Sequence, residues 1–276
     1  MPESTVGQFQ PLHAAHSIES VQFSVSFATP IADANWAAVL AAARVFKKEL
    51  PGEVPTMHMS VQGNGSSLQG QPAIALRRTG ADGSIDAEFL VAPTVLMYRT
   101  LHYTRWKEGW SHAQKLMDAV LAEIDGGIDL AAVGLNVVDK FLWAGDSFGK
   151  GSLSTLLKPA SKYVSPHVLG REDFWHSHTG AFMWHDKNTR RLVNVNLDHI
   201  EETRSGGPTR AIAITVVLSD QFQQAGYERL TDRVSGTSGV IDSHIQQLHV
   251  ENKQILANII SNDIATRIAL NSGTTI

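Results

Sequence analysis

The chain of 276 residues contains no cysteine. Disulfide bonds, thiolate zinc sites, iron–sulfur clusters and cysteine nucleophiles are therefore excluded. The absence fits a reducing compartment, and we expect a cytoplasmic protein. No sequence feature calls for a cofactor, so we predict none.

Long apolar runs and a strong net charge are also lacking. No run approaches the ~20 apolar residues of a membrane span, and residues 1–10 show no basic segment followed by an apolar one, so we expect no signal peptide and no membrane contact. The net charge of −4 at pH 7 gives no general attraction to phosphate backbones. Nucleic-acid binding is therefore not favoured, although a local basic stripe would still allow it.

The first part of the chain predicts a strand and then a helix. Apolar residues alternate with polar ones over 21–27, which is typical of a half-buried antiparallel strand. An apolar stripe after Asn35 predicts a helix with Asn35 as its N-cap. Pro51 and Gly52 are expected to end this helix after Leu50.

Two further groups of strands, each with helices, follow the first helix. Alternating or β-rich segments predict strands at 57–61, 72–78, 86–91 and 94–103, and a 3.6-residue period predicts a helix from Trp106 to Ile124. The second half predicts strands at 130–143, 174–184, 191–200 and 210–218, a short helix at 152–157, and a long amphipathic helix from Ile241 to Ile264.

This element order predicts an α+β fold, because it lacks the strict strand–helix alternation of a doubly wound parallel sheet. We expect two pseudo-repeated β-α-β(3-4)-α halves, residues 1–127 and 128–276, which could also form one continuous domain. The sheet should be antiparallel and curved, with its helices on one face. The repeat rests on element order, since the two halves show no residue-level similarity.

Ser147 lies in the segment 145–149, G-D-S-F-G, which matches the G-x-S-x-G nucleophile elbow. Glycines on both sides would allow the sharp turn that presents the hydroxyl group, and Asp198 and His249 follow in the required chain order. The upstream chain lacks both a hydrolase-like element order and a glycine-rich oxyanion loop. We therefore favour a polar loop at 145–152 and keep a Ser147 hydrolase as an alternative.

Histidines cluster in the second half. His176 and His178 would project from the same face of a strand, where they could share one metal ion with a third ligand. His185, near the end of that strand, is a candidate for the third position. The H-x-H spacing is loose, so a polar strand face with hydrogen-bonded histidines is the favoured interpretation.

Basic and aromatic residues interleave at the entry to the second helix. Arg99, Arg105 and Lys107 could contact phosphates beside stacking aromatic rings, as in single-strand binding proteins. Trp106 and Trp110, however, fall on the apolar stripe of the helix, so we expect both to anchor it in the core.

Three segments resemble a known family. They are residues 103–106 (Y-T-R-W) at a helix entry, the strand at 133–136 (V-G-L-N), and the terminal stretch 241–261, which contains Leu248 and His249. Together they resemble a sporadically distributed, uncharacterised family of bacterial proteins of about this length. Where that family has an arginine and an asparagine in the middle strand, residues 136–139 read N-V-V-D. The resemblance supplies no catalytic residues, and the patchy distribution suggests, by analogy, a link to mobile elements or defence.

Our preferred hypothesis is a non-enzymatic binding or accessory protein that acts through protein–protein contacts, including self-association. The long terminal amphipathic helix could pack on a partner. The alternatives are a hydrolase using Ser147, a metal enzyme using His176 and His178, and a nucleic-acid-binding protein that uses a saddle-like sheet.

Overall fold

The computed structural model describes residues 8–62, 67–124, 127–145, 147–204, 207–223, 228–230 and 237–270. Its strands are β1 (Gln8–Pro11), β2 (Ile18–Phe27), β3 (Gly52–Gln62), β4 (Ser67–Thr79), β5 (Ile85–Ala92), β6 (Val95–Thr100), β7 (Ile128–Ala144), β8 (Trp175–Trp184), β9 (Thr189–Arg204), β10 (Gly207–Phe222) and β11 (Glu228–Leu230). Its α-helices are α1 (Asp33–Arg44), α2 (Trp106–Leu121), α3 (Asp242–Ile259) and α4 (Asn262–Arg267). Shorter helical turns are Val45–Lys48, Ser152–Thr155, Pro166–Val168 and Thr237–Ile241.

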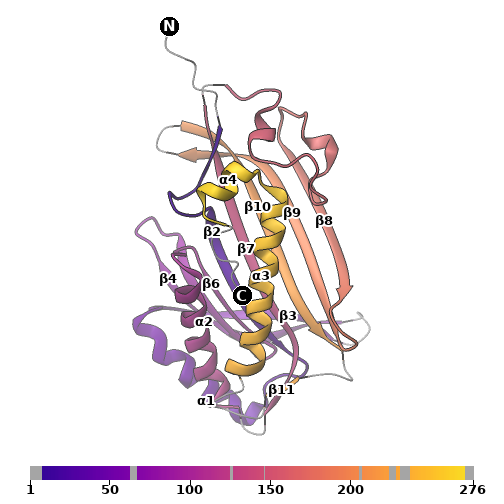
Figure 1. The fold of residues 1–276 in the computed structure, drawn as a ribbon. Helices are drawn as coiled ribbons and strands as arrows, with labels where there is room; N and C mark the ends of the chain where they lie inside the picture. The colour runs from indigo at the N-terminus through magenta and orange to yellow at the C-terminus, as the bar shows by residue number, and fades with distance from the viewer. Residues whose placement is uncertain are drawn as a thin grey trace.

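All eleven strands belong to one sheet, in the order β3-β4-β5-β6-β2-β7-β10-β9-β8, with β1 and β11 also pairing with β7. Every pairing is antiparallel. The sheet is not closed, because β3 and β8 stand at opposite ends of this order. The α-helices lie on one face of the sheet (Figure 1), which confirms the expected α+β class. We call the opposite face the open face.

The centre of the sheet joins the two parts of the chain. β2 and β7 lie side by side, with Phe23 opposite Leu135, and β6 and β10 flank this pair. Residues 1–127 and 128–276 therefore share one hydrogen-bonded ladder. The buried apolar residues on the two sides of this ladder form a single core.

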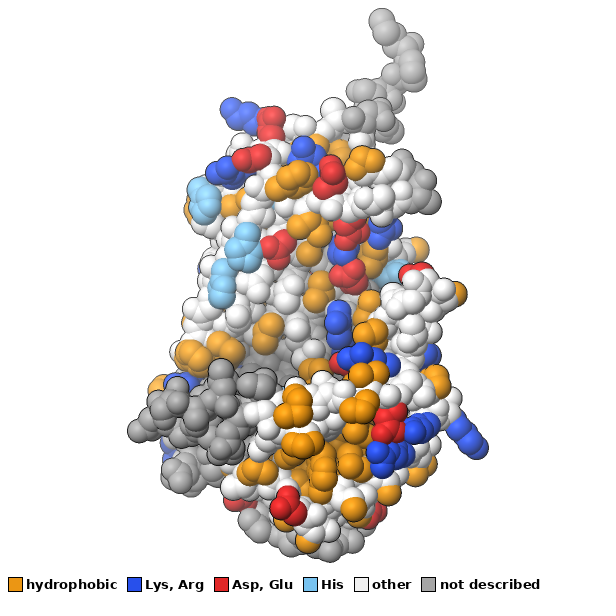
Figure 2. Space-filling view, turned by 180° about the vertical axis from the view of Figure 1, so that it is seen from behind, with side chains coloured by type: hydrophobic (Ala, Val, Ile, Leu, Met, Phe, Trp, Pro, Cys, Tyr) orange, Lys and Arg blue, Asp and Glu red, His pale blue; other side chains and the backbone are white. Residues whose placement is uncertain are grey.

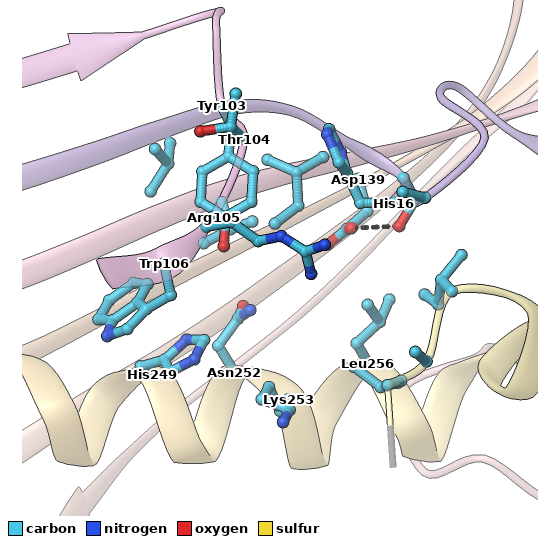
Figure 3. A pocket seen from close by; sticks show the side chains of 18 residues that line it. His16, Tyr103, Thr104, Arg105, Trp106, Asp139, His249, Asn252, Lys253 and Leu256 are labelled. Atoms are coloured by element: carbon cyan, nitrogen blue, oxygen red, sulfur yellow. Dashed lines mark hydrogen bonds between the residues drawn. The ribbon is translucent and has the colours of Figure 1, made fainter. Parts of the chain in front are cut away.

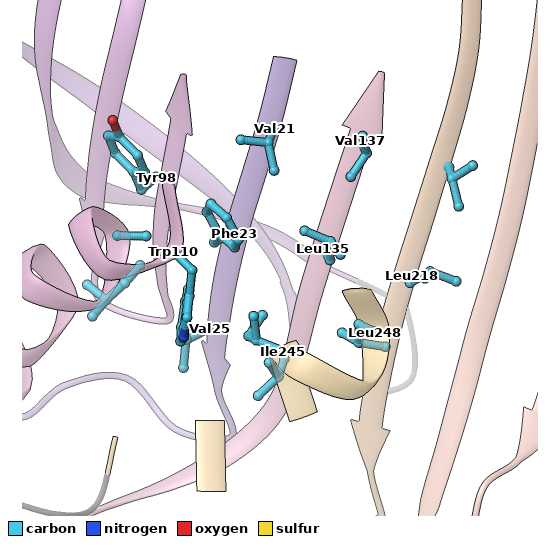
Figure 4. Packing of buried hydrophobic residues seen from close by; sticks show 14 of the residues in the cluster. Val21, Phe23, Val25, Tyr98, Trp110, Leu135, Val137, Leu218, Ile245 and Leu248 are labelled. Carbon is cyan, nitrogen blue, oxygen red and sulfur yellow. The ribbon is translucent and has the colours of Figure 1, made fainter. Parts of the chain in front are cut away.

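The core lies between the helices and the sheet face beneath them. Alternation along β2 buries Val21, Phe23 and Val25 completely or nearly so on this face. The ring of Trp110 on α2 lies 5.2 Å from the ring of Phe23, and Leu248 of α3 packs over the neighbouring strands (Figure 4). Burial of one such large side chain stabilises the fold by about 1.5–3 kcal/mol. Trp106 and Trp110 both belong to this packing, as expected.

A buried ionic network fixes α3 on the sheet. Arg191 of β9 donates from Nε to Oδ1 of Asp220 on β10 at 2.6 Å, and from Nη1 to Oε2 of Glu251 on α3 at 2.5 Å. His244, also on α3, lies 2.8 Å from Oδ2 of Asp220. The Asp220 side chain is fully buried, and its charge is compensated by Arg191. The contacts of Glu251 and His244 with this pair attach α3 to β9 and β10.

The expected N-cap of the first helix is wrong. α1 begins at Asp33, and Ala32 occupies the N-cap position without a side-chain hydrogen bond. Asn35 lies inside the first turn, where its backbone N–H donates to the carbonyl oxygen of Ala32 at 2.9 Å. The α-helix also ends earlier, at Arg44, and continues only as the tighter turn Val45–Lys48.

The single terminal helix expected from Ile241 to Ile264 is two helices. Ile260 adopts an extended conformation that ends α3. The Ser261 hydroxyl then accepts a hydrogen bond from the backbone N–H of Ile264 and caps α4. A serine that caps a new helix interrupts the older one, because its side chain competes for the backbone donors.

Among the described residues, no helix has the length and apolar content that crossing a membrane would require.

Candidate functional site

Ser147 does not meet the other residues of the hydrolase hypothesis. It is exposed in the segment that follows β7, and Asp146 beside it lies outside the described residues. Asp198 is bound to His176 on the open face, whereas His249 belongs to α3 on the helix-covered face. The sheet therefore separates the two candidate partners from each other, and the geometry offers Ser147 no catalytic base from this pair.

The predicted histidines share the open face only in part. His176 Nδ1 lies 2.5 Å from Oδ1 of Asp198 on the neighbouring strand, and His178 is exposed two residues further along β8. His185 lies in the β8–β9 turn, where its backbone N–H donates to the carbonyl oxygen of Thr189 at 2.9 Å. Within the described part of the chain, no three side chains of the metal-binding types are grouped to hold an ion.

Arg99, Arg105 and Lys107 do not form one basic surface. Arg99 projects from β6 on the open face, directly across from Glu88 of β5. Arg105 precedes α2 and Lys107 lies in its first turn, both on the helix-covered side. The sheet lies between these two positions, so a single nucleic-acid strand could not contact all three residues along a continuous stripe.

The outer edge of β8 is unusually apolar. Phe182, Met183 and Trp184 are 56%, 45% and 65% exposed, and in the described structure β8 pairs with β9 alone. The Arg190 guanidinium lies 4.3 Å from the centre of the Phe182 ring and holds that ring in place. Figure 2 shows histidine side chains gathered along one border of the hollowed open face. No Lys, Arg, Asp, Glu or Pro occurs in Trp175–Trp184, although edge strands usually carry such residues to prevent pairing.

A cavity of about 280 Å³ lies on the helix-covered face of the sheet (Figure 3). Its walls come from the β1–β2 connection, the entry to α2, β7, α3 and the end of α4. The segments at 103–106 and around 248–253, which carry the family resemblance, meet here although more than half the chain separates them from one another. Side chains at the mouth, including Arg105, are exposed, so the cavity is open to solvent.

Asp139 forms the polar floor of this cavity. Its side chain is 1% exposed, and its Oδ1 accepts a hydrogen bond from the Ser17 hydroxyl at 2.6 Å. Its other oxygen, Oδ2, has no hydrogen-bond partner among the described residues. Burial raises the pKa of Asp139 to about 6, and the Ser17 hydrogen bond opposes this rise. The carboxyl group is therefore largely ionised at neutral pH at a free-energy cost to the fold.

Two more polar side chains at the cavity each have one buried atom without a described partner. Asn252 of α3 is 5% exposed and its Oδ1 is buried and unpaired, as is Nδ1 of His16 in the β1–β2 connection. Burial, with a smaller contribution from His13, lowers the pKa of His16. Buried polar atoms in native proteins nearly always have partners, so these three atoms are open to hydrogen bonds from a ligand or from water.

Aromatic side chains form one wall of the cavity. The rings of Trp106 and His249 stack with centres 3.7 Å apart and planes 6° apart. Burial, and then the charge of Lys253, lowers the pKa of His249 to about 4, so this ring is neutral at physiological pH. Burial also raises the pKa of Tyr103 to about 12. Neither His249 nor Tyr103 is therefore poised to exchange protons near pH 7.

Sequence reasoning did not identify Asp139, Asn252 or His16 as site residues. One signal was present for Asp139: alternation along β7 places it on the same face as Leu135, Val137 and Phe141, all of which are buried. A carboxylate in an otherwise apolar strand face is a candidate functional group. Asn252 and His16 carry no comparable local signal.

Comparison with known proteins found no matching family model and no matching curated protein. The resemblance described above therefore rests on its quoted motifs and stays a prediction.

Proposed function

We propose that this is a non-enzymatic binding protein that acts through protein–protein contacts, with β8 as its contact edge. The observation that carries this proposal is the run of ten residues in β8 that has no charge and no proline, together with three exposed large apolar side chains at one end. Such an edge exposes unpaired backbone groups and apolar area at the same time, and both are satisfied when another strand pairs with it.

The partner we infer is a second copy of the chain. A two-fold axis through Gly180 would pair β8 with itself in the antiparallel manner of the rest of the sheet. His176 would then lie opposite Trp184, and His178 opposite Phe182, on the open face. These cross-strand pairs bring no like charges together at neutral pH, and aromatic pairs stabilise such contacts.

Charge introduced at the edge tests this proposal. The variant Phe182→Lys/Trp184→Lys should weaken the dimer by at least about tenfold, because it removes two interface aromatics and places two charged ammonium groups in the interface. Val45→Lys is the matched control, since Val45 is 73% exposed and lies far along the chain at the end of α1. Sedimentation equilibrium over a range of protein concentrations measures the dissociation constant. A wild-type chain that stays monomeric at every concentration would overturn the proposal.

Cysteine scanning then tests the register. Because the natural chain has no cysteine, single cysteines placed in turn at 177–183 report only their own contacts. Antiparallel self-pairing brings just one position next to its own copy, so disulfide-linked dimers should peak at Gly180→Cys and fall off on both sides. Equal cross-linking at all positions would indicate random collision and not a defined interface.

We also infer that the two halves are pseudo-repeats. In each half a central strand (β2 or β7) precedes a meander that returns to its side (β6 or β10), and a helix follows (α2 or α3). The suggested link to mobile elements or defence remains part of this proposal, and the genes beside this one would test it.

A further inference from the structure

The cavity beside α2 and α3 is independent of the β8 edge and has its own chemistry. Its deepest polar groups, Asp139 Oδ2 and Asn252 Oδ1, are both hydrogen-bond acceptors that lack a donor in the described structure. A buried ionised carboxylate is costly when it has no partner. Both acceptors would be satisfied by a group that brings several N–H donors and a positive charge, such as an ammonium group.

The rest of the cavity carries the opposite charge. Arg105 and Lys253 line it, and neither has an ion-pair partner among the salt bridges of the described residues. In Figure 3, the Arg105 side chain extends from the α2 entry toward Asp139, and Lys253 lies on α3 one residue beyond Asn252. A simple anion would be repelled by Asp139, and a simple cation by Arg105 and Lys253. A molecule that carries one positive and one negative group would find an oppositely charged side chain for each of them.

The remaining walls are apolar. Val137 and Leu256 contribute aliphatic surface, and the stacked pair of Trp106 and His249 presents a rigid aromatic side. The volume of about 280 Å³ lies just below the usual range for sites of drug-sized ligands, so the occupant must be small. These walls would receive a short apolar or aromatic substituent.

We propose that this cavity binds a small zwitterion of the size of a free amino acid, with its ammonium group at Asp139 and Asn252 and its carboxylate at Arg105 and Lys253. Ser17 holds the Asp139 carboxyl in position through Oδ1 and leaves Oδ2 for the ligand. This site is separate from the proposed β8 interface, and neither proposal depends on the other.

A panel of ligands tests the charge pattern. The twenty free L-amino acids are screened at millimolar concentration by thermal unfolding, together with the N-acetyl and carboxamide derivatives of each compound that raises the melting temperature. We expect a subset with apolar side chains to raise it by several degrees, and both derivatives to lose the effect. If the carboxamides bind as well as the acids, the site recognises the amine alone, and the proposed carboxylate contacts are wrong. If no amino acid binds, the proposal is overturned.

Three variants assign the contacts by calorimetric titration with the best amino acid. Asp139→Asn and Arg105→Gln should each raise the dissociation constant by about 10- to 100-fold, because each removes a charge-assisted hydrogen bond. Lys107→Gln removes a neighbouring positive charge outside the cavity and should leave affinity unchanged. Asn at 139 still accepts from Ser17, so the fold is retained, and a melting curve without ligand verifies this. Unchanged affinity in Asp139→Asn would overturn the assignment.

Discussion

At the scale of single residues, Asp139 stands out because its burial opposes folding. Its neighbours on the same face of β7 are apolar, and the only described hydrogen bond to its carboxyl group comes from Ser17. An unfolded chain exposes this carboxyl group to water, where its pKa is near 3.9. In the folded protein burial raises the pKa to about 6. The protein therefore tolerates a destabilising group at the floor of its cavity, as functional sites often do.

This difference between the folded and unfolded pKa values of Asp139 makes the stability of the protein depend on pH. Between pH 4 and pH 6 the folded state holds the Asp139 proton and the unfolded state does not, so raising the pH through this window lowers the free energy of unfolding. The free energy of unfolding falls by about 3 kcal/mol across this window and stays lower above pH 6. Asp139→Asn removes this loss, so the variant should be more stable than the natural protein at pH 7.5 and nearly equal to it below pH 4.

Urea unfolding at several pH values measures the effect as the difference between variant and natural protein. This difference cancels the titration of all other groups. Glu123→Gln serves as the control, since Glu123 is exposed at the end of α2 and its substitution should shift stability little at any pH. A destabilised Asp139→Asn at pH 7.5 would show that the carboxylate has a favourable partner in solution.

At the scale of elements, the end of α4 shows a helix-ending motif built on an unusual residue. The N–H of Leu270 donates to the carbonyl of Ala265 at 2.9 Å, and that of Ala269 donates to Thr266 at 3.1 Å. This is the Schellman arrangement, which requires a left-handed residue that is usually glycine. Here Ala269 takes that place with φ of 52°, and it is the one non-glycine residue with positive φ in the described structure.

Ala269→Gly should therefore stabilise the protein by up to about 1 kcal/mol. Removal of Cβ relieves the strain of the left-handed conformation, and this gain exceeds the cost of the greater flexibility that glycine gives the unfolded chain. Chemical denaturation measures the change. Ala38→Gly, at an exposed position in the interior of α1, is the control with the opposite expected sign, a loss of about 1 kcal/mol. If both variants lose stability equally, the positive φ at Ala269 carries no strain.

At the scale of the whole molecule, the β2–β7 ladder decides how the chain folds. The ladder joins residues 1–127 to 128–276, and the helices of both parts cover one core. Separation would expose the buried side chains Phe23 and Leu135 along two new sheet edges. We therefore expect neither part to fold alone, and the intact chain to unfold in one transition.

Separate expression of residues 1–127 and 128–276 tests this expectation. Each part should show poor dispersion of amide signals in NMR spectra, and co-expression should restore a folded complex with native-like spectra. Two independent calorimetric transitions in the intact protein would contradict it and would support the alternative of two domains.

The sequence by itself determined most of the elements. The alternation over 21–27 and the 3.6-residue period after Trp106 predicted β2 and α2, because a strand or helix buries one face and its period follows from local backbone geometry. The sequence pattern did not predict the boundary between α3 and α4. The apolar period continues across Ser261, but the cap hydrogen bond of this residue ends one helix and begins the next. The edge composition of β8 was also present in the sequence, although only the strand order shows that β8 is an edge.

Tertiary structure alone decided which residues meet. Arg99 and Arg105 are near neighbours in sequence, yet the sheet separates them, because the chain crosses from the open face to the helix-covered face at the end of β6. His16, Asp139 and Asn252 are distant in sequence, yet they line one cavity. Such contacts depend on strand order and helix packing across the whole chain, which no local period encodes, and so the candidate site became visible only in the folded molecule.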